Sequence, residues 1–161
     1  MATPRSEQLR SADLRAALGV VADMAAVIGD ADGFARCGLD RLPDLAASEL
    51  TTLSVCDLSN GRRHVTGVPA GAIGAAEREA FDWHFRDHPL VRYHAVEGGR
   101  RAHRISDSMP FARFRASALY ADYYRRVGID HAVALPIHVG DGWLVSFVLN
   151  RRGRDFSDRE V

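Results

Sequence analysis

Lysine is absent from this sequence: all 21 basic residues among its 161 are arginines. Schiff-base enzymes, pyridoxal phosphate enzymes, Walker A nucleotide-binding proteins and protein kinases each depend on a lysine amine. The sequence therefore excludes these classes. Arginine keeps its proton at physiological pH, so these side chains can bind anions or stack on rings but are poor general bases.

Cysteine, net charge and long apolar runs are also scarce. Cys37 and Cys56 form no CxxC pattern, which argues against a disulfide scaffold and fits reduced thiols. The 21 acidic residues balance the arginines, so no overall positive field attracts nucleic acid. No apolar run has the length of a membrane span, and the first ten residues, MATPRSEQLR, lack the apolar core of a signal peptide. We expect a cytoplasmic protein with no membrane partner.

The composition is that of one soluble domain. Hydrophobic residues make up 47% of the chain and charged residues 26%, and this length is typical of a single hydrophobic core. We therefore predict one domain over residues 1–161.

The spacing of apolar residues predicts helices over 6–29 and about 32–47. Asp32 is the expected N-cap of the second helix. The first helix carries apolar residues three or four positions apart: Leu14, Leu18, Val21, Ala25 and Ile28. Both helices are rich in alanine, so they can pack closely against a neighbour or against a second copy of the chain.

From residue 49 onward the pattern is that of strands joined by tight turns, with helical segments between them. Asn60-Gly61 and Gly140-Asp141 favour hairpin turns. Pro136 requires a bulge or an unpaired position in its strand, and Ser157 with Glu160 forms a capping box that predicts the start of another helix. The expected elements are strands near 49–58 and 62–68, a helix over 73–86, a loop over 88–102, an edge strand over 102–106, a helix over 110–127, and strands over 131–139 and 142–150.

This order predicts an α+β fold with an antiparallel sheet of five to six strands and without βαβ alternation. Alternation along the strands gives the two faces of the sheet different side chains. One face carries bulky residues: Leu53, Val55, Val133, Leu135, Ile137, Val145 and Phe147. The other carries small or weakly polar residues: Thr52, Ser54, Cys56, Ala132, Ala134 and Ser146. A face of small side chains leaves room for a ligand or receives large side chains from the inserted helices.

Several strings in this order resemble the GAF-like sensor domains found at the N-terminus of LuxR-type helix-turn-helix transcriptional regulators. They are Asp87-His88-Pro89-Leu90 with Tyr93, Arg104-Ile105-Ser106-Asp107, Leu119-Tyr120 with Tyr123, Val127-Gly128-Ile129-Asp130-His131, Leu149-Asn150-Arg151 and Asp155-Phe156-Ser157-Asp158-Arg159-Glu160. The resemblance covers the whole chain. It implies a GAF/PAS-like sheet of order 2-1-5-4-3, with a helical bundle on one face and a ligand cavity under inserted helices on the other. It also implies that DNA is bound only through a further domain, beyond residue 161.

The candidate ligand pocket lies between the small-residue face and the aromatic residues of the inserted segments. Its residues are Ser54, Cys56, Phe81, Trp83, Phe85, Tyr93, Phe111, Tyr120, Tyr123, Ala134 and Ser146. We expect a small-molecule effector and no cofactor. The alternative is that the aromatic rings fill this space completely.

Two other groups of residues suggest ligand chemistry, and both have an ordinary structural explanation. His84 and His88 are four residues apart, but His88 precedes Pro89 and no strict metal-ligand motif is present, so we predict no metal site. Arginine pairs at 62–63, 100–101, 125–126 and 151–152 are expected at solvated loop ends.

Three functions remain open. The first is a non-catalytic ligand-sensing or dimerisation domain of a bacterial LuxR-type regulator. A homodimer would form there through the first and last helices, and ligand would shift their pairing. The second is a small GAF- or PAS-like redox enzyme using Cys56, which requires a depressed thiol pKa. The third is a pure protein-interaction module, which predicts an exposed apolar stripe on residues 14–28.

Overall fold

The computed structural model describes residues 9–161 and places a five-stranded antiparallel sheet at their centre, in the order β2-β1-β5-β4-β3. The strands are β1 (Leu50–Asp57), β2 (Arg62–Val68), β3 (His103–Arg104), β4 (His131–Gly140) and β5 (Trp143–Arg151). The predicted α+β class and strand order are therefore confirmed, with five strands among the described residues.

Both predicted hairpins are present. Gly61 has φ +65° in the turn between β1 and β2, and Asp141 and Gly142 have φ +52° and +79° between β4 and β5. A bulge between Pro136 and His138 accommodates the proline, as the sequence requires.

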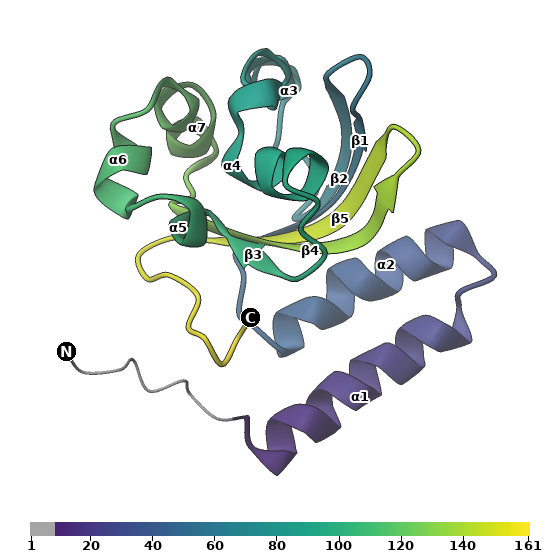
Figure 1. The fold of residues 1–161 in the computed structure, drawn as a ribbon. Helices are drawn as coiled ribbons and strands as arrows, with labels where there is room; N and C mark the ends of the chain where they lie inside the picture. Colours follow the sequence, from purple (N-terminus) through teal and green to yellow (C-terminus); the bar gives the residue numbers. More distant parts are fainter. Residues whose placement is uncertain (1–8) are drawn as a thin grey trace.

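Helices cover both faces of the sheet (Figure 1). On one face lie α1 (Ser11–Ala26) and α2 (Ala31–Arg41), followed by a 3₁₀ turn over Leu42–Asp44. On the other lie α3 (Ala75–Trp83), α4 (Pro89–Val91), α5 (Ile105–Ser108), α6 (Phe111–Arg115) and α7 (Arg125–Val127). Each face buries its own hydrophobic cluster, so the sheet separates two cores.

Only some residues of the bulky sheet face are buried beneath α2. Val133, Phe147 and Leu149 are buried there with Val20 and Leu39 of the two helices. Ile137, predicted on this face, is 47% exposed, because it is the extra residue of the bulge and falls outside the regular alternation.

The predicted apolar residues of the first helix point away from the core. Leu18 and Ile28 are 68% and 75% exposed, and Leu14 and Val21 are exposed as well. The packed side of α1 is instead formed by Val20, with Met24 beside it. The helix begins at Ser11, and residues 6–8 of the prediction lie outside the described part of the chain.

Local hydrogen bonds explain where the other helix boundaries differ from prediction. The N-cap of α2 is Asp30, whose carboxylate accepts from the Asp32 N–H at 3.1 Å, so Asp32 is not the cap. The predicted helix over 110–127 breaks at Ser117. Its hydroxyl donates to the Phe114 carbonyl at 2.6 Å and accepts from the Tyr120 N–H at 3.2 Å, which caps a new segment.

The predicted helix over 73–86 begins at Ala75, and a 3₁₀ turn follows it at Phe85–Asp87. The predicted loop over 88–102 holds α4 and a π-helical turn at Arg92–Val96. A second π-helical turn, Tyr120–Tyr124, leads into α7.

The last described residues are tied to both faces of the sheet. Arg104 donates to the Phe156 carbonyl at 2.7 Å and pairs with Asp158 at 2.9 Å. Arg159 pairs with Asp13 of α1 at 2.6 Å. The Glu160 carboxylate accepts from the Ser157 N–H at 2.8 Å, as in a capping box, but 158–160 form only a turn.

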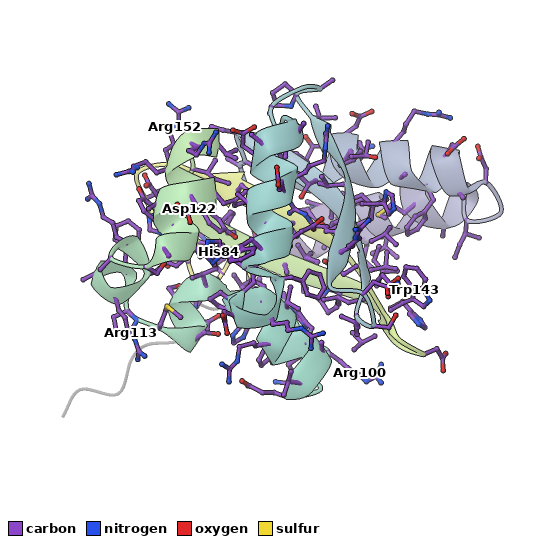
Figure 2. The ribbon with its side chains drawn as sticks, turned by 90° about the horizontal axis from the view of Figure 1, so that it is seen from above. His84, Arg100, Arg113, Asp122, Trp143 and Arg152 are labelled. Carbon is purple, nitrogen blue, oxygen red and sulfur yellow. The ribbon has the colours of Figure 1, made fainter. Side chains whose placement is uncertain are left out.

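The arginine pairs divide between solvent and core. Arg100 and Arg152 extend from the surface (Figure 2). Arg63 and Arg151, however, are buried, because each lies on a strand at a position that faces inward. For these two residues the expectation of a solvated loop end is wrong.

Among residues 9–161, no helix combines the length and the apolar character that a membrane span requires.

Gly38 sets the distance between α2 and the sheet. A Cβ atom at this position would overlap the ring of Phe147. We expect Gly38→Val to lower the free energy of unfolding by about 2 kcal/mol, because a filled core does not admit extra methyl groups. Urea unfolding followed by circular dichroism measures this. Gly19, on α1, has nothing within 4 Å of the same atom, so Gly19→Ala should stabilise by up to about 1 kcal/mol. A Gly38→Val variant as stable as wild type would contradict this packing.

Candidate functional site

The small-residue face of the sheet is the more deeply buried of the two. Thr52, Ser54 and Cys56 of β1 are almost completely enclosed, and Ser54 lies directly opposite Ser146 of β5. Ala134 of β4 continues this face. Since these side chains are small, the helices above them supply most of the volume of this core.

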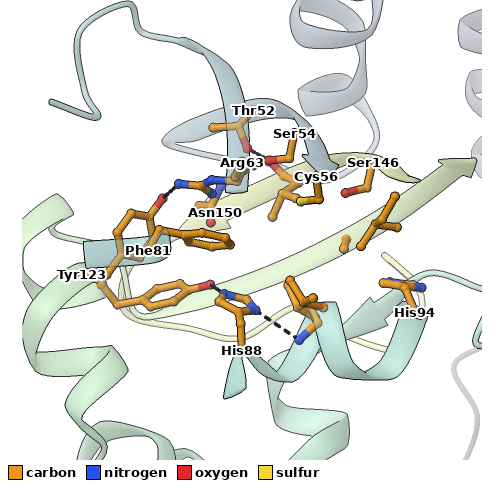
Figure 3. A pocket seen from close by; sticks show the side chains of 16 residues that line it. Thr52, Ser54, Cys56, Arg63, Phe81, His88, His94, Tyr123, Ser146 and Asn150 are labelled. Carbon is orange, nitrogen blue, oxygen red and sulfur yellow. Dashed lines mark hydrogen bonds between the residues drawn. The ribbon is translucent and has the colours of Figure 1, made fainter. Parts of the chain in front are cut away.

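Aromatic rings from the inserted helices cover this face. Phe81 of α3 packs edge-on against Tyr123, with ring centroids 5.3 Å apart, and its ring lies 4.8 Å from that of His88. Tyr124 packs edge-on against Phe114 at 4.9 Å. Between this layer and the sheet lies a cavity of about 30 Å³ (Figure 3), which has room for roughly two water molecules.

Six of the predicted pocket residues line this cavity. They are Ser54, Cys56, Phe81, Tyr123, Ala134 and Ser146. Both sides of the predicted pocket, the small sheet face and the aromatic helices, therefore meet at one place.

The other five predicted pocket residues lie elsewhere. Trp83 is 85% exposed, because two positions along a helix place it on the side opposite Phe81. Phe85 is buried beside Phe81 but outside the cavity lining. Tyr93 stacks on His103 at the β3 edge, with centroids 3.5 Å apart.

Phe111 and Tyr120 form a separate aromatic contact, with centroids 6.5 Å apart. The break at Ser117 separates α6 from the segment above the cavity. Phe111 consequently packs against His131 at 4.7 Å, beyond the cavity lining.

Sequence reasoning missed four polar residues of the cavity: Arg63, His88, His94 and Asn150. Arg63 could have been found from the hairpin. Counting back from the Asn60-Gly61 turn pairs it with Cys56, on the inward face. His94 and His88 gave no such signal, since their burial follows from the helical turns of the segment expected to be a loop.

Arg63 is the charged residue of the cavity and is only 9% exposed. Its Nη2 donates to the Tyr123 hydroxyl at 2.9 Å, and its Cζ lies 3.4 Å from the centroid of the Phe81 ring. Stacking on the ring face compensates part of the cost of burying the guanidinium. Arg63 Nε has no hydrogen-bond partner.

The two cavity histidines are neutral. Nδ1 of His88 accepts from the Leu90 N–H at 3.2 Å, so Nε2 carries the hydrogen and donates to the Tyr124 hydroxyl at 2.8 Å. Burial, with a smaller effect from Arg63, lowers the pKa of His88 to about 3. Burial also lowers the pKa of His94, whose Nδ1 hydrogen bonds to the Gly99 carbonyl at 2.7 Å.

The histidines considered as metal ligands have separate partners. His84 contacts Asp122 at 2.8 Å on the outer surface (Figure 2), whereas His88 faces the cavity. Within the described chain, no three His, Cys, Asp or Glu side chains gather closely enough to hold a metal ion.

Unpartnered polar atoms concentrate at the cavity. Four buried side-chain atoms of residues 9–161 lack a hydrogen-bond partner, and three of them belong to cavity residues: Ser54 Oγ, Arg63 Nε and His94 Nε2. Buried polar atoms normally have partners, since leaving one unpaired costs about 1–3 kcal/mol. The cavity therefore offers hydrogen-bonding groups that the protein itself does not use.

Cys56 lacks the environment of a reactive thiol. Burial raises its pKa to about 12, which outweighs the opposite effect of nearby Arg63. A redox role requires a depressed thiol pKa and access to solvent, and Cys56 has neither.

Comparison with known proteins identifies the fold. A scan against protein-family models finds no match, and a search of curated proteins finds no significant one. Among solved structures, the chain is similar to the VqsR LBD domain from Pseudomonas aeruginosa, with a TM-score of 0.66 and 10% sequence identity. The match covers 93% of this chain and 86% of that one.

The buried His88 predicts a specific acid sensitivity. Its folded pKa, about 3, lies below the unfolded value of 6.5. The neutral ring therefore contributes its full stability above pH 6.5, and this contribution is lost as the pH falls toward 3. In urea unfolding between pH 6.5 and about 5, the wild type should lose up to about 1.4 kcal/mol per pH unit more than His88→Gln. Thr66→Val, at an exposed position without a titratable group, supplies the control and should keep the wild-type slope. Equal slopes for wild type and His88→Gln would show that His88 does not titrate in this way.

Proposed function

We propose that this chain is a non-catalytic, GAF-like ligand-sensing domain of a cytoplasmic LuxR-type transcriptional regulator. The observation that carries the proposal is the cavity between the small-residue face and the aromatic helices. Three of its polar atoms have no partner within the protein. Its lining has the chemistry typical of a small-molecule site, with apolar walls and a few convergent polar groups.

The likeness to the VqsR LBD domain supports this proposal. That domain is named as an LBD, a ligand-binding domain, and this chain is similar to it in fold. Because fold alone does not fix function, the likeness is supporting evidence and the cavity chemistry is the main argument. In this proposal, DNA is bound by a separate domain of the regulator.

The exposed side of α1 supports a second part of the proposal, a homodimer. Leu14, Leu18 and Val21 recur at spacings of four and three residues, and Ile28 follows in the turn after the helix. Each is more than half exposed. Such a stripe is typical of a helix that pairs with another helix. We propose that a second copy of α1 covers it, which also accounts for the interaction surface expected on residues 14–28.

Ser54→Val tests whether the cavity binds an effector. Removing the unpartnered hydroxyl and adding a β-branched side chain to a strand should raise the free energy of unfolding by about 1 kcal/mol. The same variant should lose its response to an effector. In a melting-temperature screen against neutral, acidic and basic metabolites, at least one compound should stabilise the wild type by mass action and leave Ser54→Val unchanged.

Thr66→Val is the matched control, because Thr66 neighbours this region on β2 but is exposed to solvent. It should respond to the compound as the wild type does. A screen without any stabilising compound, or a compound that stabilises Ser54→Val equally, would overturn the proposed site.

Leu18→Arg tests the dimer. Analytical ultracentrifugation of the wild type should show a dimer. A buried unpaired charge at the helix contact should raise its dissociation constant at least about tenfold, equivalent to about 1.4 kcal/mol. Trp83→Ser removes an exposed apolar side chain on the other side of the sheet and should leave the dimer intact. A wild-type monomer, or a Leu18→Arg dimer of unchanged affinity, would contradict the α1 contact.

A further inference from the structure

The guanidinium of Arg63 lies in the cavity without a negatively charged partner. Within residues 9–161, its hydrogen bond goes to the neutral Tyr123 hydroxyl, and it forms no ion pair. The nearby carboxylate of Asp82 accepts a hydrogen bond from the backbone N–H of Arg63 at 3.0 Å, and it forms no ion pair with the guanidinium. An arginine this deeply buried is normally paired, because burial of an uncompensated charge is costly.

The other titratable groups that line the cavity carry no charge that could balance Arg63. His88 and His94 are neutral, and burial keeps the Cys56 thiol and the Tyr124 hydroxyl protonated. The lining therefore has a net charge of one positive unit, and its best complement is a ligand with one negative charge.

We propose that the cavity binds the carboxylate group of a small organic acid through the Arg63 guanidinium. This inference rests on the proposed function, since it specifies the effector class of the same site. The Nε atom of Arg63 supplies an unused donor, and guanidinium groups match carboxylates in geometry as well as in charge.

The position of Ser54 provides a second donor for the same group. Arg63 is opposite Cys56 and Ser54 is two residues before it on β1, so the two side chains are diagonal neighbours on one face. The Ser54 hydroxyl is unpartnered. The cavity of about 30 Å³ has the size of a carboxylate head group rather than of a whole ligand.

The rest of the lining indicates the body of the ligand. Four aliphatic side chains, Leu90, Val91, Leu144 and Val148, make part of the rest of the lining apolar. His94 is at the other end of the cavity from Arg63 (Figure 3). Its Nδ1 hydrogen faces the Gly99 carbonyl, so Nε2 is an unused acceptor for a hydroxyl group. A flat acid with an apolar body and a distal hydroxyl has groups that match both ends. Because the cavity as it stands holds only the head group, the covering aromatic rings must move apart to admit the body.

Inorganic phosphate and phosphate esters fit less well. A phosphate dianion would leave the site with one excess negative charge, and it needs more donors than one guanidinium and a hydroxyl supply. We therefore assign the site to carboxylates and include phosphate as a test.

The test uses four probes on the whole chain: 4-hydroxybenzoate, its neutral isostere 4-hydroxybenzamide, benzoate and inorganic phosphate. Melting temperature and isothermal titration calorimetry should show saturable binding of the two carboxylates, tighter for 4-hydroxybenzoate. The amide and phosphate should have no effect at the same concentrations. Arg63→Gln should raise the carboxylate dissociation constant at least tenfold, while Arg62→Gln, a change at the exposed neighbour, should leave it unchanged.

Arg63→Met separates a binding role from a structural one. If Arg63 serves the ligand, its replacement by an apolar side chain of similar length should leave the melting temperature without ligand unchanged or higher, and carboxylate binding should be lost. Carboxylate binding that survives in both Arg63 variants would overturn the proposal. Stabilisation by the amide but not by the acids would also overturn the carboxylate proposal. The proposed sensing function would still hold in that case. Failure of all four probes together with every compound of the metabolite screen would overturn the sensing function as well.

Discussion

Small side chains along the inner face of the sheet make the inserted helices responsible for filling this core. Phe81, Tyr123 and Tyr124 meet this demand with rings packed edge to face. Because the rings have fixed shapes, a small cavity remains where their edges meet the strands. Arg63 extends into this cavity and stacks on the ring of Phe81. The polar chemistry of the cavity therefore follows from the apolar geometry around it.

The sequence was sufficient for the parts of the fold that depend on short-range rules. Turn residues such as Asn60-Gly61 set the hairpin, and the period of two then assigned Ser54 and Ser146 to one face, where they pair directly. The strand order came from the resemblance to GAF-like sensor domains and is the observed one. Phe81 and Tyr123 were recognised as covering residues because aromatic side chains seek buried positions.

Features that depend on the packing of distant segments could not be predicted from the sequence. The apolar residues of α1 left open whether they pack within the domain or form an exposed stripe. The structure buries Val20 against α2 and the sheet and directs Leu18 outward. Trp83 was assigned to the pocket by residue type, although the helical turn directs it to solvent. Arg63 was assigned to solvent on the same kind of argument, and only the strand register reveals that it is inside.

Arg104 joins two regions that are far apart along the chain. It lies at the junction of β3 and α5, in the layer that covers the cavity, and it holds the backbone of Phe156 and the carboxylate of Asp158 at once. Any displacement of α5 must either carry residues 156–158 along or break both contacts. Arg159, the residue after Asp158, forms an ion pair with Asp13 of α1. A displacement of the helices on the cavity side is therefore coupled, through two guanidinium groups, to α1 on the far side of the sheet.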